Sequence, residues 1–91
     1  MAVMQVAQAT DRETYEAVMK VIDFEHDRPT GCRFQAAGEL PDGRMRIVVI
    51  WESQEDSDNF YLERLAPAFR EVGVDDSGDG PPETVELLHQ F

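Results

Sequence analysis

Positions 47–51 read Ile, Val, Val, Ile and Trp, an apolar run with no polar residue to face solvent. β-branched and aromatic residues favour extended backbone, and residues 45–52 as a whole are short for a buried helix. Successive side chains of a strand point to opposite faces, so an unbroken apolar run needs a cover on both faces. We therefore expect a central strand that is buried on two sides.

A hairpin is indicated just before this run. Residues 32–40 are also β-prone, and Asp42-Gly43 between two such segments is a strong hairpin signal. A two-residue loop at Asp42 and Gly43 would make one face apolar and give the other face pairs of opposite charge. In this register the face toward the helices holds Phe34, Ala36, Val49 and Trp51, and the opposite face holds Ala37, Val48 and Ile50 with the pairs Glu39–Arg46 and Arg33–Glu52.

Two helices are expected around the hairpin. Residues 10–13 form a capping box in which Thr10 caps the first helix, and the hydroxyl of Ser53 can cap the second. Pro67 has no amide donor, which predicts a kink or break between Leu65 and Pro67. The apolar stripes at helical spacing are Tyr15, Val18, Met19 and Ile22 in the first helix, and Tyr61, Leu65, Ala68, Phe69 and Val72 in the second.

Further strands are expected at residues 2–8 and 83–91, the latter with Val85, Leu87, His89 and Phe91 toward the helices. The order βαββαβ predicts an α+β, ferredoxin-like fold: an antiparallel four-stranded sheet with two helices on one face. Residues 1–91 suffice for one such domain. Because the chain's own helices cover only one face, we expect a homodimer through the open sheet face.

Composition narrows the choice of partners. Nineteen acidic and eight basic residues give a formal charge of -11, which disfavours nucleic acid and anionic membrane surfaces as partners. No apolar run approaches the ~20 residues that span a bilayer. Cys32 is the only cysteine, which excludes an internal disulfide and a Cys-rich metal site. We expect a cytoplasmic protein.

Several aromatic and polar residues are candidates for a ligand site. Trp51 and Phe34, near the expected path of Tyr61, form either a pocket for a flat ligand or ordinary core packing. Tyr61 and Arg64 could offer a hydroxyl and a cation that stabilise a developing phenolate or enolate. Alternatively, Arg64 pairs with nearby acids on the surface.

The two histidines and the acidic loop are weaker candidates. His89 could act as an acid or base in the cavity, or be a hydrogen-bonded core histidine. His26 beside Asp27 is more typical of a solvated loop histidine, and Cys32 of a structural thiol. Residues 75–80 resemble a calcium loop in spacing, but the following Pro81-Pro82 and strand lack the second helix of such a site. We expect no metal site.

Three stretches carry a likeness to a known family: GCRFQAAG at 31–38, RIVVIWES at 46–53, and residues 60–73 with RLAP at 64–67. With them the chain resembles the dimeric α+β barrel superfamily, and within it the small proteins similar to antibiotic biosynthesis monooxygenases. The resemblance implies two sheets facing each other across a dimer, with a cavity between each sheet and its own helices. It also implies activities from cofactor-free oxygenation of aromatic polyketides to heme degradation.

Residues that match the activities of this family are few. Where heme-degrading members have His, Trp and Asn, this chain has Arg70, Phe60 and either Gln5 or Gln8. This difference argues against heme cleavage, and we expect no cofactor. The polyketide oxygenases use Asn, Trp, Tyr and Arg, for which the counterparts by type are Asn59, Trp51, Tyr61 and Arg64.

Three hypotheses on function follow. The first is a cofactor-independent monooxygenase that binds a small apolar or aromatic molecule between sheet and helices, at Phe34, Trp51 and Phe60, with His89, Tyr61 and Arg64 as catalytic groups. The second is a non-enzymatic ligand-binding or dimerisation module. The third is an isomerase or other acid–base enzyme that relies on the two histidines.

Overall fold

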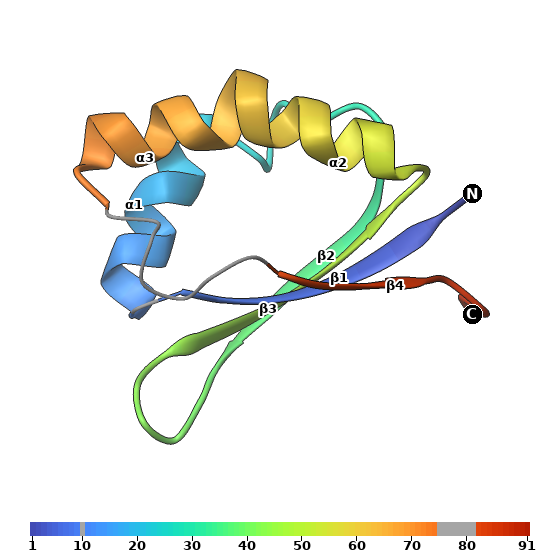
Figure 1. The fold of residues 1–91 in the computed structure, drawn as a ribbon. Helices are drawn as coiled ribbons and strands as arrows, with labels where there is room; N and C mark the ends of the chain where they lie inside the picture. The colour runs from blue at the N-terminus through green and yellow to red at the C-terminus, as the bar shows by residue number, and fades with distance from the viewer. Residues whose placement is uncertain (10, 75–81) are drawn as a thin grey trace.

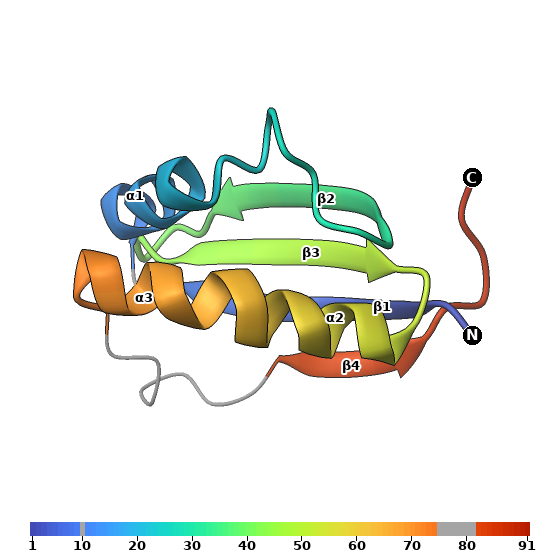
Figure 2. The ribbon, with the colours of Figure 1, turned by 90° about the horizontal axis from the view of Figure 1, so that it is seen from above.

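The computed structural model describes residues 1–9, 11–74 and 82–91. One antiparallel sheet has the strand order β2-β3-β1-β4, and all helices lie on the same side of it (Figures 1 and 2). This arrangement confirms the predicted α+β, ferredoxin-like fold with β1 and β3 in the middle. The strands are β1 (Val3–Ala9), β2 (Cys32–Glu39), β3 (Met45–Trp51) and β4 (Glu83–Glu86), and the helical segments are α1 (Arg12–Ile22), α2 (Gln54–Phe60), the π-helix η1 (Tyr61–Leu65) and α3 (Ala66–Val72).

Helix α1 is capped by Asp11, whose carboxylate accepts a 2.6 Å hydrogen bond from the Thr14 amide. This hydrogen bond lowers the pKa of Asp11. The predicted cap, Thr10, lies outside the described residues. At the other end, Asp23 adopts the left-handed conformation at φ 59°, which a short polar side chain tolerates, and its amide bonds to the Met19 carbonyl.

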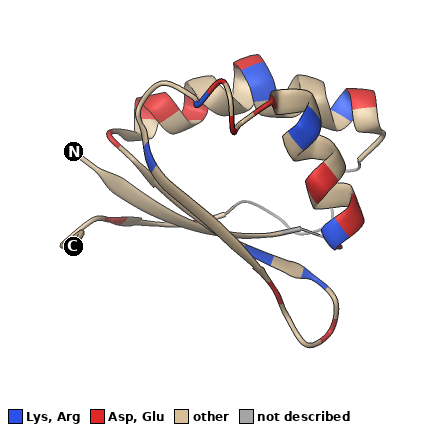
Figure 3. Cartoon of the chain, turned by 180° about the vertical axis from the view of Figure 1, so that it is seen from behind, with Lys and Arg blue, Asp and Glu red and all other residues tan. Residues whose placement is uncertain are grey.

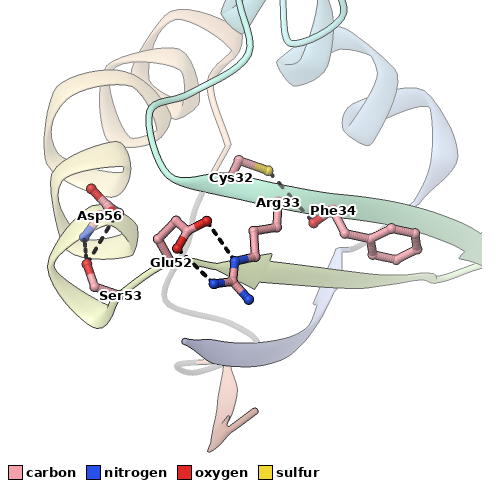
Figure 4. A network of polar contacts seen from close by, with 6 residues as sticks. All are labelled: Cys32, Arg33, Phe34, Glu52, Ser53 and Asp56. Atoms are coloured by element: carbon pink, nitrogen blue, oxygen red, sulfur yellow. Dashed lines mark hydrogen bonds and ion pairs between the residues drawn. The ribbon is translucent and has the colours of Figure 1, made fainter. Parts of the chain in front are cut away.

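The second helical segment begins as predicted, with the Asp56 amide donating to the Ser53 hydroxyl at 3.2 Å (Figure 4). The expected disturbance near Pro67 takes the form of a π turn. The Ala66 amide bonds to the Tyr61 carbonyl, five residues back. Because Pro67 has no amide to donate and its ring crowds the preceding turn, the wider η1 turn lets the backbone remain helical from α2 to α3.

The predicted register of the hairpin is wrong by one residue. The loop has three residues instead of two, because the Leu40 amide donates to the Arg44 carbonyl and the Gly43 amide to the Leu40 carbonyl. Gly43 has φ 89°, a left-handed position that suits a three-residue hairpin loop. The pairs are therefore Glu39 with Met45, Ala37 with Ile47, Gln35 with Val49 and Phe34 with Ile50.

This shift exchanges the two faces of β2. Trp51 contacts Phe60 of α2, so Trp51 and Val49 face the helices, and Val48 and Ile50 face the open side, as predicted. Partners across β2 and β3 share a face, so Phe34 lies on the open side, opposite to its predicted place. Ala36 and Ala37 are exchanged in the same way, and the pair Glu39–Arg46 does not face across the strands because Arg46 pairs with Gly38.

A bulge restores one predicted contact at the other end of β2. The register shifts between Cys32 and Phe34, and this irregularity lets Arg33 reach Glu52. Two parallel hydrogen bonds of 2.7 and 2.8 Å join the guanidinium to the carboxylate (Figure 4). They raise the pKa of Arg33 and lower that of Glu52. The predicted ion pair is thus present although the register that predicted it is not.

Strand β4 is shorter than predicted and has the opposite phase. It ends at Glu86, and beyond it the Leu87 amide still donates to the Ala2 carbonyl. Thr84 pairs with Gln5 and faces the helices, whereas Val85 pairs with Met4 and faces the open side. The predicted orientation, with Val85 toward the helices, is therefore wrong, because the open face of the sheet is apolar as well and alternation alone does not distinguish the two faces.

The core between the helices leaves part of the sheet uncovered. Val18 and Ile22 of α1 are buried against Ala68 of α3. Since α1 packs mainly against α3, it stands beside the sheet more than upon it (Figure 1). Within the described residues, no helix is long and apolar enough to cross a membrane.

Candidate functional site

An open cleft of about 1280 Å³ lies between the sheet and the helices. Ligand pockets in proteins begin at about 300 Å³, so this space is large enough for a small molecule. Its floor includes Gln5 and Val49, and its walls are rich in aromatic side chains. The aromatic residues that line it are Tyr15, Phe24, Trp51, Phe60, Tyr61 and Phe69.

Trp51 is held in the cleft wall by a buried polar cluster. Its indole Nε1 donates to Gln5 Oε1 at 3.1 Å, and the Ser57 hydroxyl donates to the same oxygen at 3.0 Å. Gln5 Nε2 in turn donates to the Thr84 hydroxyl at 3.4 Å. Trp51 is 1% exposed and its ring lies 5.2 Å from that of Phe60. The cluster thus ties β1, β3, β4 and α2 together and fixes the orientation of the indole.

A second polar contact lies on the same row of the sheet. Gln35 and Gln5 both pair with Val49, so the two glutamines flank this residue on the helix side. Gln35 Nε2 donates to the Tyr15 hydroxyl at 2.7 Å, which joins β2 to α1. Val49 therefore forms an apolar floor between two glutamines, each of which holds an aromatic side chain.

Three of the predicted site residues, Trp51, Phe60 and Tyr61, come together in the cleft. Trp51 and Phe60 pack ring against ring, as a tilted pair. Tyr61 belongs to the π-helix η1 and is exposed. Because π turns often occur at functional sites, its position there agrees with the predicted role, which stays a prediction.

The other three predicted site residues do not line this cleft. Phe34 lies on the open sheet face as a result of the hairpin register. Arg64 donates to the Ile22 carbonyl at the end of α1 and lies 3.6 Å from the Asp27 carboxylate. This contact is the alternative that the sequence left open for Arg64. His89 follows the end of β4, is exposed, and stacks on Phe91 at 5.7 Å.

His26 is exposed and contacts Asp23 instead of its sequence neighbour Asp27. Its Nδ1 lies 2.8 Å from Asp23 Oδ1, and this hydrogen bond, together with the charges of Asp23 and Glu25, raises the pKa of His26. A raised pKa in the folded state means that protonated His26 favours folding at pH below the unfolded pKa. This contribution is lost as the pH rises through the folded pKa.

We expect the substitution Asp23→Asn to lower the pKa of His26, because it removes the carboxylate but keeps a residue that tolerates the left-handed conformation. NMR titration of the imidazole ring protons measures this change. Asp42→Asn at the hairpin tip is the control and should leave the pKa of His26 unaltered. An unaltered pKa in Asp23→Asn would show that the hydrogen bond is not formed in solution.

Cys32 and the acidic loop 75–80 are the remaining candidates. Cys32 is partly buried, and burial raises the pKa of its thiol, which makes it a poor nucleophile. The calcium-like loop 75–80 lies outside the described residues. Within residues 1–9, 11–74 and 82–91, no group of three or more His, Cys, Asp and Glu side chains is arranged to hold a metal ion.

Four residues of the cleft were missed by the sequence reasoning as site residues. Tyr15 and Ser57 are polar residues on the predicted apolar side of a helix, since Tyr15 belongs to the first stripe and Ser57 lies four residues before Tyr61. Gln35 carried no such signal, because the predicted two-residue loop placed it on the open sheet face. Gln5 was noted only as a possible counterpart of an asparagine in heme-degrading proteins. The four residues are Gln5, Tyr15, Gln35 and Ser57.

Comparison with known proteins supports the fold. No protein-family model and no curated protein sequence matches this chain. Solved structures do match it over nearly its whole length. Rv0793 of Mycobacterium tuberculosis has a TM-score of 0.69 at 16% identity, covering 99% of this chain and 98% of that one.

Two further structures carry functional descriptions. A Caulobacter crescentus protein assigned to the antibiotic biosynthesis monooxygenases has a TM-score of 0.74 at 11% identity, covering 97% of this chain and 91% of its own. SnoaB, a cofactor-independent oxygenase of Streptomyces nogalater, was solved as a mutant and has a TM-score of 0.63 at 12% identity, covering 99% and 95%. The predicted likeness is therefore confirmed for the fold: this chain has the ferredoxin-like α+β fold of the antibiotic biosynthesis monooxygenase-like structures.

Proposed function

We propose that the protein binds a flat, largely apolar molecule in the cleft and oxidises it with molecular oxygen, without a metal or prosthetic group. The observation that carries this proposal is the aromatic wall of the cleft, in which Trp51 is fixed by Gln5 beside Phe60. The fold shared with SnoaB, described as a cofactor-independent oxygenase, supports the choice of reaction.

The proposed reaction converts an activated CH2 group and O2 into a carbonyl group and water. The substrate loses a proton to water that enters the open cleft, and it becomes a carbanion that is delocalised onto a ring oxygen as a phenolate. One electron passes to O2, and the resulting radical pair combines to a peroxide. This peroxide takes up a proton and loses water to leave the carbonyl. Tyr61, which lines the cleft, is proposed to donate a hydrogen bond to the phenolate.

Anthrone, whose CH2 group has this chemistry, is the probe for the proposed activity. We expect the protein to consume one O2 per anthrone and to form anthraquinone, as followed with an oxygen electrode and by absorbance. Tyr61→Phe should lower the rate about tenfold or more. Glu63→Gln, an exposed neighbour in η1 that does not line the cleft, is the matched control. Oxygen uptake no faster than without protein would refute the oxygenase proposal.

A second candidate is a non-enzymatic carrier of the same kind of ligand. One observation favours it: among the described residues that line the cleft there is no His, Lys or Cys that could take up the proton. Asp58 and Glu83 are its carboxylates, and Asp58 already accepts a 3.0 Å hydrogen bond from Gln54. If anthrone raises the melting temperature of the protein but is not oxidised, the protein is a carrier and not an oxygenase.

We also propose that a second copy of the chain covers the open sheet face. Phe34 is 43% exposed and Val85 is 44% exposed on this face, which also carries Val48 and Ile50 of the central strand. Charged residues of both signs lie on the helices and near the hairpin, whereas the middle of the sheet is almost without charge (Figure 3). A two-fold partner with the same face would bury these side chains, since homodimers pair identical surfaces.

A further inference from the structure

Gln5 and Gln35 lie on one row of the sheet but differ in their hydrogen bonds to neighbouring side chains. Neighbouring strands are about 4.8 Å apart, so the backbones of the two glutamines stand roughly 10 Å apart with Val49 between them. At Gln5, the side-chain oxygen accepts two hydrogen bonds, from Trp51 and from Ser57. An amide oxygen has two lone pairs, so this acceptor is fully used.

At Gln35 the situation is different, because the amide nitrogen is the donor and the Tyr15 hydroxyl oxygen is the acceptor. A phenol can accept one hydrogen bond and still donate its own proton. In the part of the chain that the structure describes, no group accepts a hydrogen bond from the Tyr15 hydroxyl. An accepted hydrogen bond also polarises a hydroxyl group and makes it a better donor. Tyr15 is thus a donor that is held in place and not yet used.

The surroundings of this pair indicate which kind of acceptor it would meet. Tyr15 and Gln35 both line the main cleft, where Val49 and Trp51 provide apolar surface. The same pair borders a smaller hollow of about 410 Å³, whose lining includes the charged residues Arg12, Glu16 and Glu39. A flat aromatic ligand suits the first space better, because that space is larger and has several aromatic side chains in its walls, whereas the second combines small apolar residues such as Ala36 and Ala37 with the charged ones.

We infer that the Tyr15 hydroxyl donates a hydrogen bond to an oxygen atom of the bound ligand, with Gln35 as the residue that positions the phenol. This inference rests on the proposed binding of a flat apolar molecule in the cleft. It adds that the ligand carries a carbonyl or phenolic oxygen near the edge of its ring system. It also makes Tyr15 a residue that selects oxygenated ligands over hydrocarbons of the same shape.

Two probes of nearly equal shape test the selection. Fluorene and 9-fluorenone are flat tricyclic molecules that differ in a CH2 group against a carbonyl group. Quenching of Trp51, which is the only tryptophan and stands in the cleft wall, reports the binding of both. We expect the protein to bind 9-fluorenone about tenfold more tightly than fluorene, the typical effect of one hydrogen bond.

Variants of the pair should remove this preference without removing binding. In Tyr15→Phe the ratio of the two affinities should fall close to one, while the affinity for fluorene changes less than about twofold. In Gln35→Glu the new carboxylate would accept the hydrogen bond of the Tyr15 hydroxyl. The preference should therefore be lost although Tyr15 is intact. Glu16→Gln on the same helix, outside the main cleft, is the control and should keep the wild-type ratio.

The binding measurements test the role of Tyr15 and the binding of flat molecules in the cleft separately. If the preference for 9-fluorenone persists in Tyr15→Phe, or is absent in the wild type, Tyr15 does not bind the ligand oxygen, whereas binding of flat molecules in the cleft still holds. If neither probe binds the wild type, both the cleft proposal and the inference are wrong. Circular dichroism of each variant shows that a changed ratio is not a consequence of unfolding.

Discussion

Val48→Asp is expected to convert a dimer into monomers or into largely unfolded chains. Val48 lies on the central strand, on the open face, with Val6 of β1 and Ala36 of β2 as its neighbours across the sheet. In the proposed dimer this position is buried against the same face of the partner, where an unpaired carboxylate would cost several kcal/mol. Size-exclusion chromatography with light scattering measures the change.

A matched control distinguishes an effect at the open sheet face from the general effect of adding a charge. Val21 is 41% exposed on α1, away from the open sheet face, so Val21→Asp adds the same charge without touching the proposed interface. It should leave the mass in solution unchanged. If Val48→Asp unfolds the chain, Phe34→Glu on the edge strand β2 repeats the test at a more exposed position of the same face. A persistent, well-folded dimer in both variants would contradict the proposed interface.

Trp51→Ala is expected to lower the free energy of unfolding by about 3–5 kcal/mol, the usual loss when a large buried aromatic side chain is truncated. Trp51 is the most deeply buried large side chain that the structure describes. Its loss removes the contact with Phe60 and one of the two donors to Gln5. Urea unfolding at one fixed protein concentration measures the effect, since a dimer's stability depends on concentration.

Trp51→Phe separates the contribution of the aromatic ring to stability from that of the indole hydrogen bond. It keeps an aromatic ring beside Phe60 but removes the indole N–H, so Gln5 loses a partner and only part of the volume is lost. We expect a loss of about 1–3 kcal/mol, smaller than that of Trp51→Ala. A loss below about 1 kcal/mol in Trp51→Ala would mean that the Trp51, Gln5 and Ser57 cluster does not organise the cleft.

The helices and the central strand were predictable because their signals are local. The apolar run that begins at Ile47, the stripe of Tyr15, Val18 and Ile22, and the disturbance near Pro67 all depend on residues within a few positions of one another. Periodicity and capping act over this same range. Element order then restricted the topology, because crossovers between strands of one sheet have a preferred hand.

The register of the sheet was less predictable because it depends on one glycine. A two-residue and a three-residue loop both suit Asp42-Gly43, and they differ by one position in every later pair. In the structure Gly43 is left-handed and Asp42 is not, whereas a two-residue type I′ loop needs both residues left-handed. The loop is therefore the longer one, which places Phe34 on the open face and Gln35 in the cleft. Both faces of β2 contain small or apolar residues, so hydrophobic pattern alone did not distinguish them.

From the order of its residues alone, this chain could be assigned a ferredoxin-like α+β fold and a central strand that is apolar on both faces, because short-range periodicity and chain topology determine these. The composition of the cleft was decided only by the tertiary structure. Gln5, Ser57 and Trp51 meet across 46 to 52 positions of the chain, and Gln35 reaches Tyr15 across 20. Such contacts form only when packing of α1 on α3 and the strand register have set which side chains face each other.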